Sequence, residues 1–120
     1  MGIKFLNKEH IDRYERAKNS VRFENNTKGY ASFTYLLTSD LLYEACSNVF
    51  YPTFGLEKAL DILENDKFLS TSQQRMLKLA LDLYLSNSEG DSIIRVFSGF
   101  NETNRKVALE ALKIYFSLFD

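Results

Sequence analysis

Apolar residues recur at the three- and four-residue spacing of an α-helix along almost the whole of this 120-residue chain. The pattern is clearest near the end, where Asn101 or Thr103 can cap a segment with one apolar and one polar face. Its expected inward residues are Val107, Ala108, Ala111, Leu112, Tyr115, Phe116 and Phe119, and its expected outward residues are Lys106, Glu110, Lys113 and Ser117. A helical period of this kind predicts an all-α fold.

Residues that cap helices divide the rest of the chain into further segments. The first helix is expected to start near residue 8, with a narrow apolar stripe formed by Ile11, Tyr14 and Ala17. The helix that begins at residues 70–72 has only a narrow polar stripe, so we expect it to be the central helix of the fold. The proposed N-caps are, in order, Asn7, Thr27, Ser39 or Asp40, one of residues 70–72, and Asn101 or Thr103.

The only proline, Pro52, marks the end of a third predicted helix, because the residue before a proline is pushed out of the α region. That helix buries Leu41, Leu42, Ala45, Cys46, Val49 and Phe50 on one face. Another helix is expected from Leu56, with Leu60 among its inward residues. Residues 92–98 suit a short helix or a single strand, and helix is favoured because no second strand is available for pairing. The sum is one domain, residues 1–120, built as a compact irregular bundle of six to seven helices.

The composition is that of a soluble globular protein, with 45% hydrophobic residues, 26% charged residues and a formal net charge of −1. No run approaches the roughly 18 apolar residues needed to cross a bilayer, so no membrane insertion is expected. The near-neutral charge argues against a nucleic-acid binder. The charge is uneven, however: residues 1–30 hold seven basic and four acidic groups (net +3), and residues 31–66 hold one basic and six acidic groups (net −5).

The residues that usually carry chemistry are scarce. The chain has one histidine and one cysteine, too few for a zinc site, and no glycine-rich phosphate loop. His10 is expected to be a surface or capping residue, and Cys46 a small buried hydrophobic residue. We therefore predict no catalytic residue, no cofactor and no enzymatic activity. A lone cysteine and the lack of a signal-peptide pattern fit a reducing cytoplasm.

Two features that are neighbours in the sequence could bind a partner protein. Tyr51 and Phe54 are aromatic residues in a loop, a residue type that often anchors interfaces, although they can equally fill a gap between helices. The acidic residues that follow can form a ridge on one helix face, although such a ridge is more often a plain solvated face. The predicted partner-binding residues are Tyr51, Phe54, Glu57, Asp61, Glu64 and Asp66.

Three stretches resemble a family of small, functionally uncharacterised proteins of Gram-positive bacteria and their phages. They are FLNKEH (residues 5–10), FTYLLTSDLLYEACSNVFYP (33–52) and TSQQRMLKLALDLY (71–84). Members of that family usually carry Gly-Trp just before the Thr-Ser pair, and this chain has no tryptophan. The resemblance implies an accessory protein of a prophage or mobile element, and it implies no catalytic residues.

These observations favour a non-enzymatic module that binds a host or defence-system protein. An inhibitor of a CRISPR nuclease, acting by occlusion of a basic surface, would fit an aromatic and acidic interface. The alternative is a nucleic-acid-binding regulator that uses the basic first helix, through Lys8, Arg13, Arg16, Lys18 and Arg22. Self-association through the aromatic loop also stays open.

Overall fold

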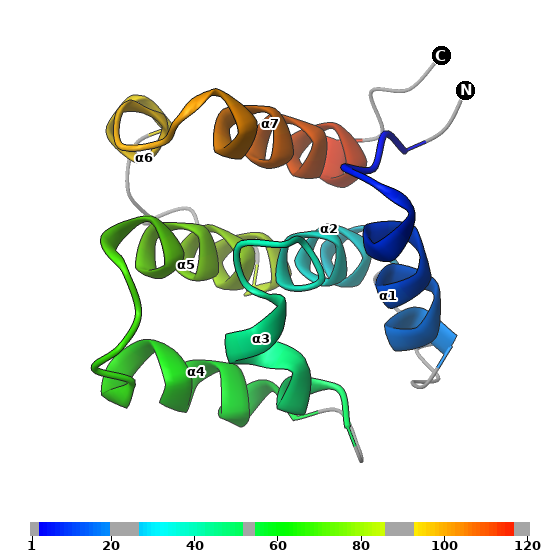
Figure 1. Cartoon of the computed structure of the whole chain (residues 1–120), viewed down its shortest axis with the longest axis horizontal. Coiled ribbons are helices and arrows are strands. Elements are labelled where there is room, and N and C mark those ends of the chain that lie inside the picture. Colours follow the sequence, from blue (N-terminus) through cyan, green and yellow to red (C-terminus); the bar gives the residue numbers. More distant parts are fainter. Residues whose placement is uncertain (1–2, 20–26, 52–54, 86–92, 117–120) are drawn as a thin grey trace.

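The computed structural model describes residues 3–19, 27–51, 55–85 and 93–116, and all regular structure within these ranges is helical (Figure 1). The elements are α1 (Lys8–Asn19), α2 (Thr27–Leu37), α3 (Tyr43–Cys46), a 3₁₀ turn η1 (Ser47–Val49), α4 (Leu56–Asn65), α5 (Thr71–Leu85), α6 (Ile93–Ser98) and α7 (Glu102–Phe116). The all-α prediction is confirmed. Residues 93–98, for which the pattern also allowed a strand, form a helix.

Helix α2 lies in the middle of the bundle. It packs against α1, α5 and α7, and Figure 1 shows α2 and α5 between α7 on one side and α3 and α4 on the other. Every residue from Ser32 to Ser39 is buried. Helix α2 is therefore largely buried, and α5, which the sequence pattern placed at the centre, shares that position with α2.

Aromatic rings join the separate helices into one core. The Phe33 ring of α2 packs edge-on against Phe50, which follows η1, with 6.2 Å between the centroids. On another side it meets Tyr84 of α5 at 5.2 Å. Phe33 and Leu36 are fully buried. Burial of such large apolar side chains is the main favourable contribution to folding, so this cluster fixes how α2, α5 and the η1 region pack.

Three predicted N-caps are confirmed by hydrogen bonds. The Asn7 side-chain oxygen accepts from the His10 amide at 2.8 Å, and that of Asn101 accepts from the Asn104 amide at 2.8 Å. Ser70 and Gln73 form a reciprocal capping box, in which the Gln73 amide donates to Ser70 Oγ and the Ser70 amide to Gln73 Oε1.

The predicted helix over residues 41–50 is interrupted. Ser39 does not cap it, because its hydroxyl donates to the Leu36 carbonyl at 2.6 Å and so stays with α2. The chain then makes a turn and two short helical pieces, α3 and η1, instead of one continuous helix. The predicted apolar face survives the interruption, since Leu42, Cys46, Val49 and Phe50 are all buried.

Cys46 is fully buried, as predicted, and burial raises the pKa of its thiol to about 12. Because the thiolate is the reactive form, native protein should react with Ellman's reagent more than about tenfold slower than protein in guanidinium chloride. The measurement is the rate of absorbance change at neutral pH. Equal rates in both states would contradict the buried position of Cys46.

His10 is buried, which contradicts its prediction as a surface or capping residue. The Leu6 amide donates to its Nδ1 at 3.2 Å, and its Nε2 lies 2.9 Å from the Tyr35 carbonyl of α2. Its ring also packs against Phe5 and Tyr35, with centroids at 5.1 and 4.6 Å. These partners require a neutral ring with the proton on Nε2. His10 therefore holds the N-terminal segment, residues 3–7, against α2.

Glu110 of α7 was predicted to face water and is only 5% exposed. Its Oε2 accepts from the Lys4 amide at 2.9 Å, and its Oε1 lies 4.0 Å from Lys113 Nζ. The Tyr35 hydroxyl donates to the Lys4 carbonyl at 2.6 Å. Both backbone groups of Lys4 are thus bound, and the N-terminal segment joins α2 to α7. The same helix leaves Phe116, predicted inward, 58% exposed.

Candidate functional site

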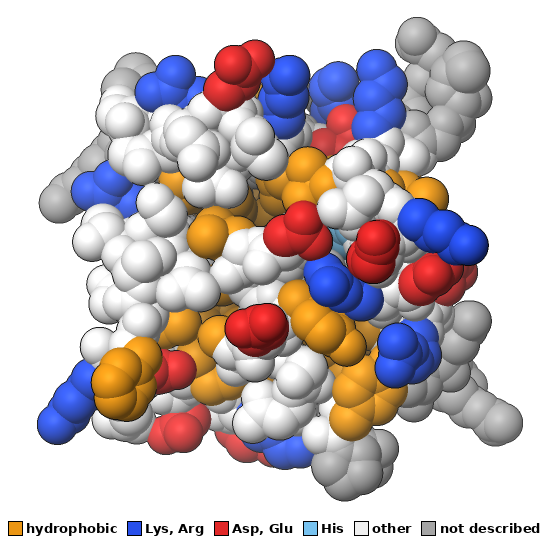
Figure 2. Space-filling model, viewed as in Figure 1, with side chains coloured by type: hydrophobic (Ala, Val, Ile, Leu, Met, Phe, Trp, Pro, Cys, Tyr) orange, Lys and Arg blue, Asp and Glu red, His pale blue; other side chains and the backbone are white. Residues whose placement is uncertain are grey.

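Three of the predicted partner-binding residues form an exposed row on α4. Glu57, Asp61 and Glu64 are all exposed, whereas Ala59, on the opposite side of the helix, is fully buried. Residues at i, i+4 and i+7 lie on one face of a helix, so the three carboxylates are neighbours. Figure 2 shows acidic side chains along the edge where Figure 1 places α4. The predicted acidic row is therefore present as three exposed carboxylates on one side of α4.

Leu60 lies within this acidic row and is 38% exposed, although the sequence pattern predicted it to face inward. It follows Glu57 by three positions and precedes Glu64 by four, which places all three on the same side of α4. Helix α4 touches α5, α3 and η1 along its other side. Its outer face therefore combines carboxylates with one apolar side chain.

Phe68 is the most exposed large apolar residue among those that the structure describes, at 96%. It lies in the short connection between α4 and α5, directly after the acidic row. The amide of Phe68 donates to Asp66 Oδ1 at 2.8 Å, a local turn that fixes the backbone. After Phe68 in the sequence, Leu69 is buried and Ser70 caps α5. Phe68 is held outward by a connection that is anchored at both ends.

The remaining predicted partner-binding residues have other positions. The carboxylate of Asp66 is 2.8 Å from the Phe68 amide, so it shapes the connection. Tyr51 is half-buried and packs against the core, and burial raises the pKa of its hydroxyl. Phe54 lies outside the described residues. The structure thus brings together the three acids of α4, whereas Asp66 belongs to the connection and Tyr51 packs against the core.

We define the α4 face as Glu57, Leu60, Asp61, Glu64 and Phe68. Sequence reasoning missed Phe68 and Leu60. A signal for Phe68 was present, because Phe68 and Leu69 are adjacent apolar residues in a connection of only five residues between two helices. Connections of this length run over the protein surface, so two successive side chains rarely both reach the core and one of them is expected to point outward.

The basic first helix is poorly arranged for binding phosphates. Arg13 forms an ion pair with Asp40 at 2.9 Å, and its guanidinium lies 4.2 Å from the centroid of the Tyr43 ring. The exposed Lys8, Arg16 and Lys18 are interleaved with exposed acids of the same helix, namely Glu9, Asp12 and Glu15. Arg22 lies outside the described residues. Interleaved charges of both signs weaken the attraction for a polyanion.

Within the described ranges, no three His, Cys, Asp or Glu side chains come together as a metal site. His10 and Cys46, the residues best suited to proton transfer or nucleophilic attack, are both fully buried in packed surroundings. None of the described helices has the length and apolar character needed to cross a membrane.

The chain was compared with protein families, curated proteins and solved structures. No family model, no curated protein and no solved structure matches the chain. The family resemblance drawn from the three sequence stretches therefore stays an expectation, and the function has to be argued from the α4 face itself.

Proposed function

We propose that this protein is a non-enzymatic protein-binding module that uses the α4 face to cover a basic surface of its partner. The observation that carries the proposal is Phe68, an aromatic side chain almost fully exposed on an anchored connection beside the acidic row. Aromatic residues are among the commonest anchors of protein interfaces, and they bind best in an apolar pocket of the partner. Phe68 supplies that anchor.

The fixed geometry around Phe68 supports binding. The turn at Asp66 and the Ser70 cap limit the conformations of the connection, so less entropy is lost when a partner orders it. Leu60, 38% exposed on the outer side of α4, adds apolar area to the α4 face. The exposed acids Glu57, Asp61 and Glu64 place negative charge on the same side of α4 as Leu60. Charges at the rim of an interface mainly raise the association rate and select a partner of opposite sign.

The partner's chemistry follows from that charge. Between residues 55 and 68 there are four acids and two lysines, so the surface is net negative and complements a basic one. Proteins that bind nucleic acids carry such basic surfaces. A bacterial defence nuclease, which the resemblance to phage proteins makes the preferred partner, would lose access to its nucleic acid when this face covers the site. The proposed mechanism is occlusion.

The test begins with affinity capture from host lysate and sizing of the complex, which also reports self-association. The captured protein is then purified and titrated. We expect Phe68→Ala to weaken the complex about tenfold, since truncation of an interface anchor costs 1 kcal/mol or more. The matched control is Phe116→Ala, which removes another exposed phenylalanine, on α7, and should leave affinity unchanged. Equal affinities for both variants would refute the role of Phe68.

Charge reversal of the acidic row tests the electrostatic part separately. Replacing Glu57, Asp61 and Glu64 with lysine should slow association and remove its salt dependence, with little effect on folding because all three are exposed. The measurement is the association rate at two salt concentrations, by surface plasmon resonance. An unchanged association rate at both salt concentrations would mean that the acidic row is not part of the interface.

A further inference from the structure

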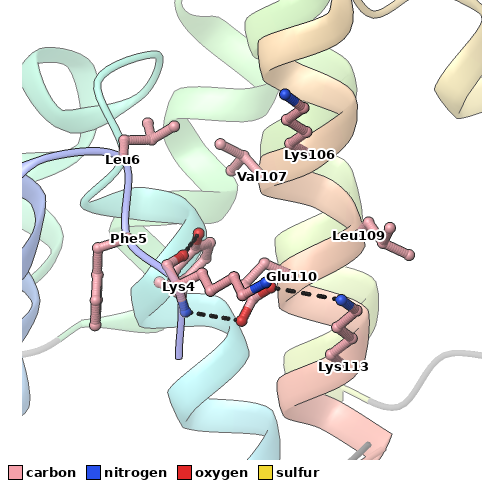
Figure 3. A pocket seen from close by; sticks show the side chains of 9 residues that line it. Lys4, Phe5, Leu6, Lys106, Val107, Leu109, Glu110 and Lys113 are labelled. Atoms are coloured by element: carbon pink, nitrogen blue, oxygen red, sulfur yellow. Dashed lines mark hydrogen bonds and ion pairs between the residues drawn. The ribbon is translucent and has the colours of Figure 1, made fainter. Parts of the chain in front are cut away.

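A pocket of about 470 Å³ lies between the N-terminal segment and α7, away from the α4 face (Figures 1 and 3). Its walls come from three elements: Lys4, Phe5 and Leu6 of the N-terminal segment, Tyr35 of α2, and one side of α7. The volume is within the range of sites that hold small molecules, roughly 300–1,000 Å³. The pocket is therefore large enough for a compact ligand.

The walls of the pocket are fixed by hydrogen bonds within the protein. The Lys4 amide donates to Glu110 and the Lys4 carbonyl accepts from the Tyr35 hydroxyl. His10 holds the next residues of the same segment through the Leu6 amide. Because these intramolecular bonds tie the segment to α2 and α7, the protein itself holds the walls of the pocket in place. A preformed site binds with a smaller entropic cost.

The charge of the pocket is predominantly positive. Among the described residues that line it, Lys4, Lys106 and Lys113 are basic and Glu110 alone is acidic. Glu110 is buried and already bound to the Lys4 amide, with Lys113 beside it, as Figure 3 shows. Lys106 also pairs with Glu102 at 3.3 Å, but both side chains are strongly exposed, so that pair is weak and can be replaced.

The rest of the lining is apolar. Phe5 and Leu6 contribute from the N-terminal segment, and Val107 and Leu109 from α7. Leu109 is 48% exposed at the surface. An apolar wall next to lysine ammonium groups suits a ligand with an anionic head and an apolar body.

We propose that this pocket binds a small organic anion, a carboxylate or phosphate ester with a compact apolar group. The anionic head interacts with the lysines, Lys106 above all, and the apolar body lies against Leu6 and Val107, whose side chains point toward each other between the N-terminal segment and α7 (Figure 3). The inference does not depend on the proposed protein-binding function, because α7 and α4 lie on opposite sides of the molecule (Figure 1). A ligand here could be present in the complex with a partner or without it.

The experiment is a titration of the ¹⁵N-labelled protein followed by NMR, with octanoate, octyl phosphate and octylamine as probes. We expect saturable shifts of the Lys4, Leu6, Lys106 and Leu109 amides with at least one anion, and at least tenfold weaker binding of octylamine. Preference for octanoate or for octyl phosphate identifies the head group. Shifts scattered over the surface, no saturation with either anion, or equal binding of the amine would overturn the proposal.

Variants localise the site. Lys106→Glu should weaken binding of the preferred anion at least tenfold, because it reverses a charge that lines the pocket. Lys8→Glu, the same change at an exposed lysine of α1 outside the pocket lining, should leave binding within about twofold. Both side chains are exposed, so the amide spectra should otherwise stay native. Equal affinity of the two variants would refute the site.

Discussion

Replacement of His10 with alanine is expected to lower the free energy of unfolding by about 3 kcal/mol. The substitution leaves a cavity in a fully buried position and removes the ring that packs against Phe5 and Tyr35. It also leaves the Leu6 amide and the Tyr35 carbonyl without their His10 partner. Each unpaired buried polar group costs about 1–3 kcal/mol unless water reaches it. The measurement is urea unfolding at pH 7.5, followed by circular dichroism.

Two further variants show where that energy comes from. His10→Gln keeps one acceptor and one donor on a side chain of similar reach, so it should recover part of the loss. Lys8→Ala changes an exposed residue in the same turn of α1 and should alter stability by less than about 0.5 kcal/mol. If His10→Ala were as mild as Lys8→Ala, the N-terminal segment would not depend on the histidine.

The parts of the fold that could be predicted from the sequence depend on local signals. Asn7, Ser70 and Asn101 cap helices through bonds to amides three positions ahead, so the sequence contains both partners. The apolar face of residues 41–50 was also readable from spacing. Its division into α3 and η1 was not, because the Ser39 hydroxyl had two choices, the start of a new helix or the end of α2.

The residues whose positions were predicted wrongly depend on distant contacts. His10 is buried because α2 brings the Tyr35 carbonyl to it, 25 positions away, and Glu110 because the Lys4 amide, 106 positions away, comes to it. A polar side chain at the edge of a helix gives no sequence signal of such a partner. The burial of Glu110 is what ties the start of the chain to α7.

The candidate site also has one part that could be predicted from the sequence and one part that could not. The acidic row could be predicted, since i, i+4 and i+7 on one helix is a local relation. The exposure of Phe68 could not be read with certainty, because either Phe68 or Leu69 could have taken the buried place. The outcome depends on how α4 and α5 meet. The sequence pointed to the loop aromatic residues Tyr51 and Phe54, whereas the strongly exposed Phe68 follows the acidic row in the sequence.

The largest pH effect is expected from the same histidine. Burial lowers the pKa of His10 below its usual value of 6.5, and the nearby Arg13 acts in the same direction. The Tyr35 carbonyl and Asp40 act in the opposite direction, but the effect of burial is larger, and Asp40 is itself paired with Arg13 at 2.9 Å. Protonation would also place a second N–H on Nδ1, against the Leu6 amide. The pKa of His10 is therefore lower in the folded protein than in the unfolded chain.

The sign of the effect follows from proton linkage. Below about pH 6.5 the unfolded chain binds a proton at His10 and the folded protein does not, so stability falls as the pH falls toward the folded-state pKa. The slope can approach 1.4 kcal/mol per pH unit, the value for one proton. Above about pH 7.5 His10 contributes no pH dependence. The measurement is the free energy of unfolding from urea curves between pH 8 and pH 5.

His10→Gln separates this contribution from that of the carboxylates, because glutamine can occupy the site but cannot titrate. The variant should be less stable than the wild type at pH 7.5, and the two should converge as the pH falls to 5. Parallel stability curves over that range would mean that His10 takes up its proton equally in both states. In that case burial and the Leu6 bond to Nδ1 would not disfavour protonation of His10 in the folded protein, and its contribution to holding the N-terminal segment would not change with pH.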